Sequence, residues 1–129
     1  MKAPKVRALV DALTEKLAGP AIRLIDKGKV EDNVRRYRLK SLAGYLDFEL
    51  DEKAKTAWIL NLEIKPQFRE QGQATRLLDE LFRIVAGGLV VPGNFTADRA
   101  EARGLLRRMK RLGRQYRVRI GDYSFDPGK

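Results

Sequence analysis

The stretch Leu60–Leu81, LNLEIKPQFREQGQATRLLDEL, decides the fold of this chain. Its first part alternates apolar and polar residues as far as Pro66, which is typical of a strand with one buried face. A polar loop then carries Arg69, Gly72 and Ala74 at the spacing Arg-x-x-Gly-x-Ala, and a helical pattern of apolar residues follows at once. A strand that feeds a glycine-containing loop at a helix start is a geometry for holding phosphates. The first amides of a helix have no partner inside it, and the helix dipole is positive there.

The composition limits the chemistry. The chain has 129 residues, of which 43% are hydrophobic, and we expect a single domain over 1–129. It has no cysteine and no histidine, which excludes disulfides, thiolate nucleophiles and the usual general base, so no metal site is expected. No apolar run approaches membrane-spanning length and no signal peptide is evident, so we expect a cytoplasmic protein without a membrane partner.

The charge is strongly basic and unevenly placed. The net charge is +10, and the eight basic residues between Arg103 and Arg119 are not interrupted by any acidic one. This segment is interpreted as a surface for nucleic acid, for an acidic protein or for the phosphates of a cofactor. The alternative is a solvated helix face that keeps the protein dispersed, since few aromatic residues are interleaved for base stacking.

Hydrophobic periodicity and turn residues predict the order of elements. We expect helices at 5–17, 72–86 and 97–112, and strands at 21–26, 34–40, 43–50, 56–65, 89–91, 116–120 and 123–125, with a loose tail at 126–129. Pro92 cannot donate to a sheet ladder, so the strand at 89–91 should have a free edge or a bulge there. Gly113 is expected just after the end of the last helix. The order predicts an α/β fold of the α+β type, with a mixed, mostly antiparallel sheet flanked by helices.

This order, together with the phosphate-type loop, resembles the GNAT superfamily of acetyl-CoA-dependent N-acetyltransferases. The residues that carry the resemblance are Leu62, Ile64, Pro66, Arg69, Gly72, Ala74, Leu77 and Leu78. The resemblance implies that acetyl-CoA is the acyl donor and that its pyrophosphate lies on the loop from Arg69 to Thr75. It also implies that the pantetheine arm pairs with the preceding strand, which family members splay from the next one. The implied acetyl-CoA-binding residues are Leu62, Ile64, Arg69, Glu70, Gln71, Gly72, Gln73, Ala74 and Thr75.

The chain departs from the family at its catalytic positions. Many members have an Asn on the last helix and, seven residues later, a Tyr that acts as general acid. One alignment places Arg99 and Leu106 at these two positions, and the other places Ala102 and Met109 there. A glutamate that some members use as base is replaced by Trp58.

Catalysis then needs substitutes, and the nearest candidates by topology are Glu63, Tyr116 and Tyr123. Each has a structural alternative. Glu63 could simply be an exposed strand residue on the face opposite Leu62. Tyr116 lies in step with Val118 and Ile120, which is typical of a core tyrosine, and Tyr123 could be a partner of Phe125 on a closing strand.

Two functions remain open. The first is an acetyltransferase that moves the acetyl group of acetyl-CoA to an unidentified amine by direct attack. The second is a catalytically silent GNAT-fold binding or structural protein that uses Arg103–Arg119 for nucleic acid or an acidic protein.

Overall fold

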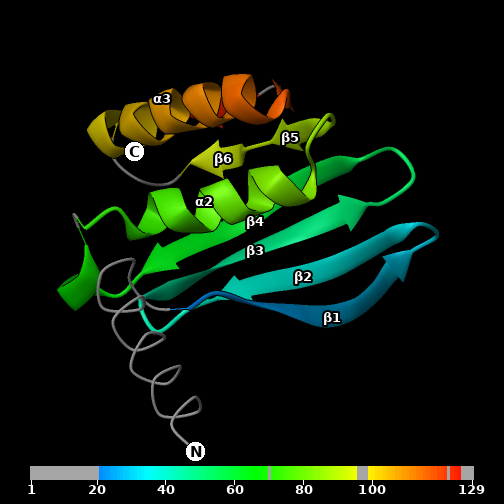
Figure 1. Ribbon diagram of the computed structural model, residues 1–129, viewed down its shortest axis with the longest axis horizontal. Helices are drawn as coiled ribbons and strands as arrows, with labels where there is room; N and C mark the ends of the chain where they lie inside the picture. The colour runs from blue at the N-terminus through cyan, green and yellow to red at the C-terminus, as the bar shows by residue number, and fades with distance from the viewer. Residues whose placement is uncertain (1–20, 70, 96–98, 122, 126–129) are drawn as a thin grey trace, which may run out of the picture.

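A six-stranded sheet with the order β1-β2-β3-β4-β5-β7 forms the centre of the protein (Figure 1). The structure is a computed structural model that describes residues 21–69, 71–95, 99–121 and 123–125. The expected helix at 5–17 and the tail at 126–129 lie outside the described residues. The elements are β1 (Arg23–Glu31), β2 (Val34–Lys40), β3 (Gly44–Asp51), β4 (Thr56–Ile64), the 3₁₀ turn η1 (Pro66–Phe68), α2 (Gln73–Ile84), β5 (Leu89–Val91), β6 (Gly93–Phe95), α3 (Arg99–Tyr116), β7 (Arg119–Ile120) and β8 (Tyr123–Phe125).

Strands β1 to β4 form an antiparallel meander, whereas β4, β5 and β7 pair in parallel. The parallel pairs follow from the two helical crossovers, because a parallel connection needs a long excursion of the chain. Beyond Pro92 the chain continues from β5 into β6, and after Gly121 it continues from β7 into β8. The strands β6 and β8 pair in parallel as a separate two-stranded sheet. The structure confirms the predicted α+β class, with a mixed, mostly antiparallel sheet and helices.

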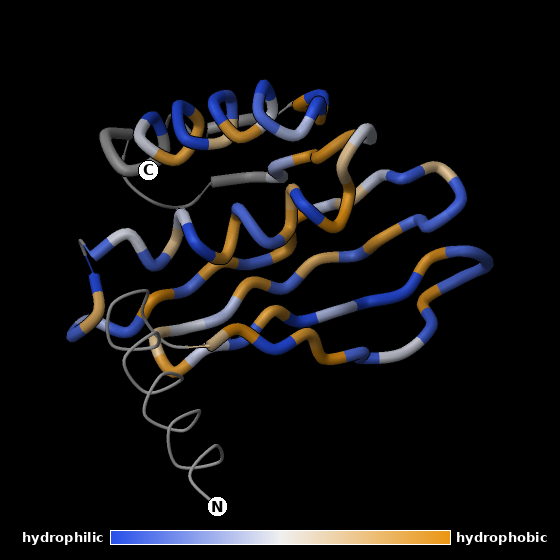
Figure 2. The backbone as a smooth tube through the Cα atoms, in the orientation of Figure 1, coloured by the Kyte–Doolittle hydropathy of each residue, from blue (hydrophilic) through white to orange (hydrophobic). Residues whose placement is uncertain are grey.

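The hydrophobic core lies between one face of the sheet and the helices. Alternate residues of β3 point toward α2, and Leu46 and Phe48 are fully buried. The apolar stripe of α2 packs against them, and Figure 2 shows the outer side of α3 as hydrophilic with its apolar side turned inward. The helices contribute Leu77, Leu78, Leu81, Phe82, Val85, Leu106, Met109 and Leu112 to the buried cluster.

The predicted end of the last helix is wrong. The helix α3 continues to Tyr116, so Gly113 lies inside it, and only Arg119–Ile120 of the expected strand at 116–120 is extended. The residue after the helix, Arg117, has a left-handed φ of 58°, and the amide of Val118 donates to the carbonyl of Gly113 at 2.9 Å. This is the six-to-one hydrogen bond of a Schellman cap, made here without a capping glycine.

Two further predictions need correction. The strand β1 runs to Glu31, beyond the expected end at 26, because irregularities on both sides of Gly28 hide its period while its pairing with β2 continues. Pro92 lies between β5 and β6 rather than at a free edge, since β5 is an inner strand between β4 and β7.

Candidate functional site

The strand β4 is paired on both sides only over the first third of its length. It pairs with β3 from Thr56 to Ile64, but with β5 only over Thr56, Ala57 and Trp58. Gly93, the first residue of β6, still lies close to β4, because a Cβ atom there would meet the carbonyl oxygen of Ile59 at 2.8 Å. From there to Ile64, no strand of the described residues pairs with this edge of β4.

A β-bulge interrupts β4 where the second neighbour is lost. Asp47 pairs with Asn61 and Phe48 pairs with Ile59, so Leu60 is the extra residue. Leu60 is 46% exposed, which corrects the expectation that it shares a buried face with Leu62 and Ile64. The extra residue of a bulge stays outside the ladder, and bulges are over-represented beside active sites.

The loop between β4 and α2 is held against the end of the strand. The Nε atom of Arg69 donates to the carbonyl oxygen of Ile64 at 3.1 Å, and the side-chain amide of Gln71 donates to the carbonyl of Gln67 at 3.3 Å. Gly72 precedes the first turn of α2 with φ 74°, and no atom of the described residues lies within 4 Å of the place a Cβ would occupy. The glycine therefore leaves open space in front of the first amides of α2.

The remaining residues of the predicted acetyl-CoA site divide by burial. The side chains of Leu62 and Ile64 are half-buried and pack against the core, so a ligand at the edge of β4 would chiefly meet their backbone. Gln73 is buried and accepts a hydrogen bond from Arg76 at 3.3 Å, while Ala74 and Thr75 are half-buried in the first turn. Glu70 lies outside the described residues.

Glu63 belongs to a polar cluster on the sheet face opposite α2. The hydroxyl of Tyr45 donates to the Glu63 carboxylate at 2.8 Å, and the amide of Asn61 donates to the Tyr45 oxygen at 3.2 Å. The hydrogen bond to Glu63 is the largest cause that raises the pKa of Tyr45. The guanidinium of Arg38 lies 4.1 Å from the centre of the Tyr45 ring. Glu63 is exposed, as its structural interpretation predicted.

The other two catalytic candidates do not join Glu63. Tyr116, the last residue of α3, is half-buried against the core, and its hydroxyl donates to Asp79 of α2 at 2.7 Å. Tyr123 contributes its backbone to β8, and its side chain lies outside the described part of the chain. Leu106 and Met109, the residues that the two alternative alignments set at the tyrosine position, are buried in the core.

A second region gathers positive charge at the end of α3. Lys110, Arg114, Arg117 and Arg119 line an open hollow of about 440 Å³ whose apolar floor includes Val118 and Ile120. The sequence predicted the basic surface, but the hollow depends on the helix end at Arg117, which it did not predict.

No cluster of carboxylates that could hold a metal ion occurs among the described residues. Within the same part of the chain, neither α2 nor α3 has a stretch apolar enough to span a lipid bilayer. Comparisons of the chain with protein-family models, with curated proteins and with solved structures give no match.

Proposed function

We propose that this protein binds acetyl-CoA where β4 meets α2 and transfers the acetyl group to an amine. The observation that carries the proposal is that β4 has no second neighbour from Leu60 to Ile64 among the described strands, and that the next α-helix, α2, begins after a glycine. The strand β4 then offers an unpaired edge, and the helix α2 offers the amides of its first turn. Acetyl-CoA has an amide-containing arm and a pyrophosphate to match them.

The pyrophosphate end is supported by the start of α2. The amides of Gln73, Ala74 and Thr75 belong to the first turn, where a helix presents donors and positive potential to an anion. Arg69 adds a guanidinium, which is held at the end of β4 by the bond from its Nε atom to the Ile64 carbonyl. Open space at Gly72 lets a phosphate approach the backbone.

The pantetheine arm is supported by the free edge of β4 beyond Trp58. An extended ligand gains affinity from main-chain hydrogen bonds when it adds a strand to such an edge. The bulge at Leu60 places a backbone group outside the ladder with β3. A donor of that kind could polarise the thioester carbonyl, as amides do in acyl transfer.

The transfer itself requires little from the side chains. The lone pair of a neutral amine attacks the thioester carbonyl carbon, and the tetrahedral intermediate then expels the CoA thiolate as the C–S bond breaks. The thiolate takes the proton that the new amide nitrogen loses. Holding the two reactants together supplies much of the acceleration, so the chemistry does not depend on the absent histidine.

A pair of variants at Gly72 tests the binding site. Asn and Asp have the same shape and both tolerate a left-handed backbone, so Gly72→Asn and Gly72→Asp carry the same strain. Only Asp places a negative charge where the pyrophosphate is proposed to lie. In titration calorimetry with acetyl-CoA, we expect Gly72→Asp to bind at least about tenfold more weakly than Gly72→Asn, a difference of ~1.4 kcal/mol.

Thermal unfolding of the two variants provides the control. A carboxylate near a helix N-terminus stabilises the helix, so Gly72→Asp should melt at or above the temperature of Gly72→Asn. Equal acetyl-CoA affinity in the two variants, or no binding by the wild-type protein, would overturn the proposal.

A catalytically silent acyl-CoA-binding protein is the second candidate, favoured by the burial of Leu106 and Met109. Release of the CoA thiol distinguishes the two. Because the chain has no cysteine, a thiol-reactive dye reports free CoA without background from the protein. Binding without thiol release across simple amines, polyamines and peptide amines would select the silent protein.

A further inference from the structure

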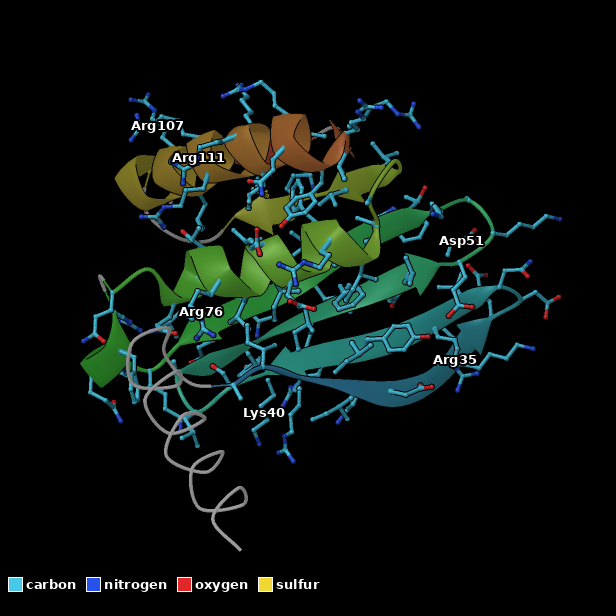
Figure 3. The ribbon with its side chains drawn as sticks, viewed as in Figure 1. Arg35, Lys40, Asp51, Arg76, Arg107 and Arg111 are labelled. Atoms are coloured by element: carbon cyan, nitrogen blue, oxygen red, sulfur yellow. The ribbon has the colours of Figure 1, made fainter. Side chains whose placement is uncertain are left out.

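The exposed side of α3 carries a straight line of positive charge. Arg103, Arg107, Lys110 and Arg114, here called the cationic row, are separated by four, three and four residues, and all four are exposed. Each step is about one turn of an α-helix, so the four residues lie on one side of α3. The row covers about three turns and spans about 16 Å at 1.5 Å per residue. Figure 3 shows Arg107 on α3 in the part of the view opposite Lys40.

The helix does not compensate this charge. Arg103 and Arg107, Arg107 and Arg111, and Lys110 and Arg114 are like-charged pairs at the spacing i,i+4, which destabilise a helix. No Asp or Glu occurs from 103 to 121, and none of the ion pairs found among the described residues includes a cation of this segment. A face that served only solvation would relieve the repulsion by mixing signs.

The row continues into the hollow at the end of the helix. Lys110 and Arg114 belong to both, and Arg117 and Arg119 complete the cationic lining. Arg117 occupies a left-handed position, φ 58°, where glycine is the usual residue. The chain keeps a cation there in spite of the backbone preference, which adds to the evidence that the positive charge is used.

We propose that α3 binds double-stranded DNA through its phosphates, with the cationic row along the backbone and one phosphate in the hollow. Seven of the eight cations between Arg103 and Arg119 are arginines, whose planar guanidinium pairs with phosphate in a bidentate manner. The surface is independent of acetyl-CoA binding, since it belongs to a different element from the β4–α2 site.

The residue types on α3 favour a duplex over a single strand. Single strands are held by aromatic side chains on which the bases stack. The one aromatic residue between Arg103 and Arg119 is Tyr116, which is half-buried and bonded to Asp79. A surface of cations without a stacking platform contacts the sugar–phosphate backbone and does not read sequence.

Fluorescence anisotropy with a labelled 20-base-pair DNA duplex tests the proposal over a range of KCl concentrations. The variant Arg103→Gln/Arg107→Gln/Arg114→Gln removes three positive charges from the row. Counterion release contributes a slope of about −0.9 in log K against log salt for each phosphate contact. We therefore expect the triple variant to bind with a slope about 2.7 less steep and to lose affinity by several hundredfold at ~0.1 M salt.

The matched control removes three positive charges elsewhere, through Lys27→Gln/Lys40→Gln/Lys53→Gln, all exposed residues of the meander. We expect the control to change the slope by less than about 1, the size of a single contact. Because Gln relieves the repulsion within α3, the row variant should be at least as resistant to urea as the wild type. Its acetyl-CoA affinity should stay within about twofold of the wild type, where a tenfold change equals 1.4 kcal/mol.

Four results would overturn the proposal. They are no duplex binding at low salt, equal losses in the row variant and the control, tighter binding of the corresponding single strand or RNA duplex, and equally tight binding of poly-glutamate. The last would assign the surface to acidic proteins.

Discussion

Gly104 and Gly113 lie in the same helix, and the structure gives them opposite roles. In the part of the chain that the structure describes, no atom lies within 4 Å of a Cβ atom built on Gly104. A Cβ atom on Gly113 would meet the carbonyl oxygen of Val118 at 2.7 Å, in the tight turn that the capping hydrogen bond of Val118 closes. Gly104 therefore lowers the stability of the helix without a packing role, whereas Gly113 allows the chain to turn back toward β7.

The same substitution at the two glycines should change stability in opposite directions. Alanine is favoured over glycine inside a helix by about 1 kcal/mol, so Gly104→Ala should raise the free energy of unfolding by 0.5 to ~1 kcal/mol. Gly113→Ala should lower it by about 1–3 kcal/mol, because the added methyl group overpacks the turn. Urea unfolding monitored by the fluorescence of Trp58 measures both variants. Stabilisation by Gly113→Ala would contradict the observed end of α3.

At the scale of elements, a hydrogen bond between helices accounts for Tyr116 without catalysis. Its hydroxyl donates to the Asp79 carboxylate at 2.7 Å, and the same carboxylate forms an ion pair with Arg83 at 3.3 Å. Because Asp79 and Arg83 belong to α2, this carboxylate links the end of α3 to α2. Tyr116→Phe removes the hydroxyl and keeps the ring. We expect it to lower the free energy of unfolding by about 1.5–3 kcal/mol, the usual range for a hydrogen bond to a charged group.

The kinetic readout separates this structural role from that of a general acid. A positioned proton donor contributes about a hundredfold or more to a rate. If Tyr116 only joins the helices, acetyl transfer by Tyr116→Phe should keep its kcat within about twofold under conditions where the variant is folded, far from the hundredfold of a lost acid. A hundredfold fall in kcat with unchanged stability would restore Tyr116 as a catalytic residue.

The sequence predicts most elements because their signals are local. Alternation in β3, the apolar stripe of α2 and the turn residues at 51–55 each identify an element without knowledge of its neighbours. The end of α3 depends on a contact between Gly113 and Val118 instead. Glycine close to a helix end is the usual stop signal, so the pattern alone favours the wrong boundary.

The pairing of Glu63 with Tyr45 shows why part of the candidate site could not be predicted. Counted outward from the pair Asp51 and Thr56, a regular hairpin would place Tyr45 opposite Leu62. The bulge at Leu60 advances the register by one residue and brings Glu63 opposite Tyr45 instead. No residue type marks a bulge of this kind, and a shift of one residue exchanges the two faces of a strand.

At the scale of the whole molecule, the sheet and α3 differ in whether their positive charges are paired with carboxylates. On the sheet, cations face carboxylates on adjacent strands. Arg36 lies 2.7 Å from Glu49, and Arg38 lies 2.7 Å from Asp47. The first pair is partly exposed and the second is part-buried, and both neutralise charge on this face. Much of the net charge of +10 therefore lies on α3. The proposed polyanion surface is thus on a different element from the proposed acyl-CoA site.

The central claim is that acetyl-CoA binds where β4 meets α2, and a titration of the ¹⁵N-labelled protein followed by backbone amide chemical shifts tests it most directly. The account predicts that acetyl-CoA shifts the amides of 59–64 and 71–76 first. An excess of inorganic pyrophosphate should move only the second group, because pyrophosphate lacks the pantetheine arm. Shifts confined to 103–120 would instead place the ligand on the cations of α3, and that result would contradict the account.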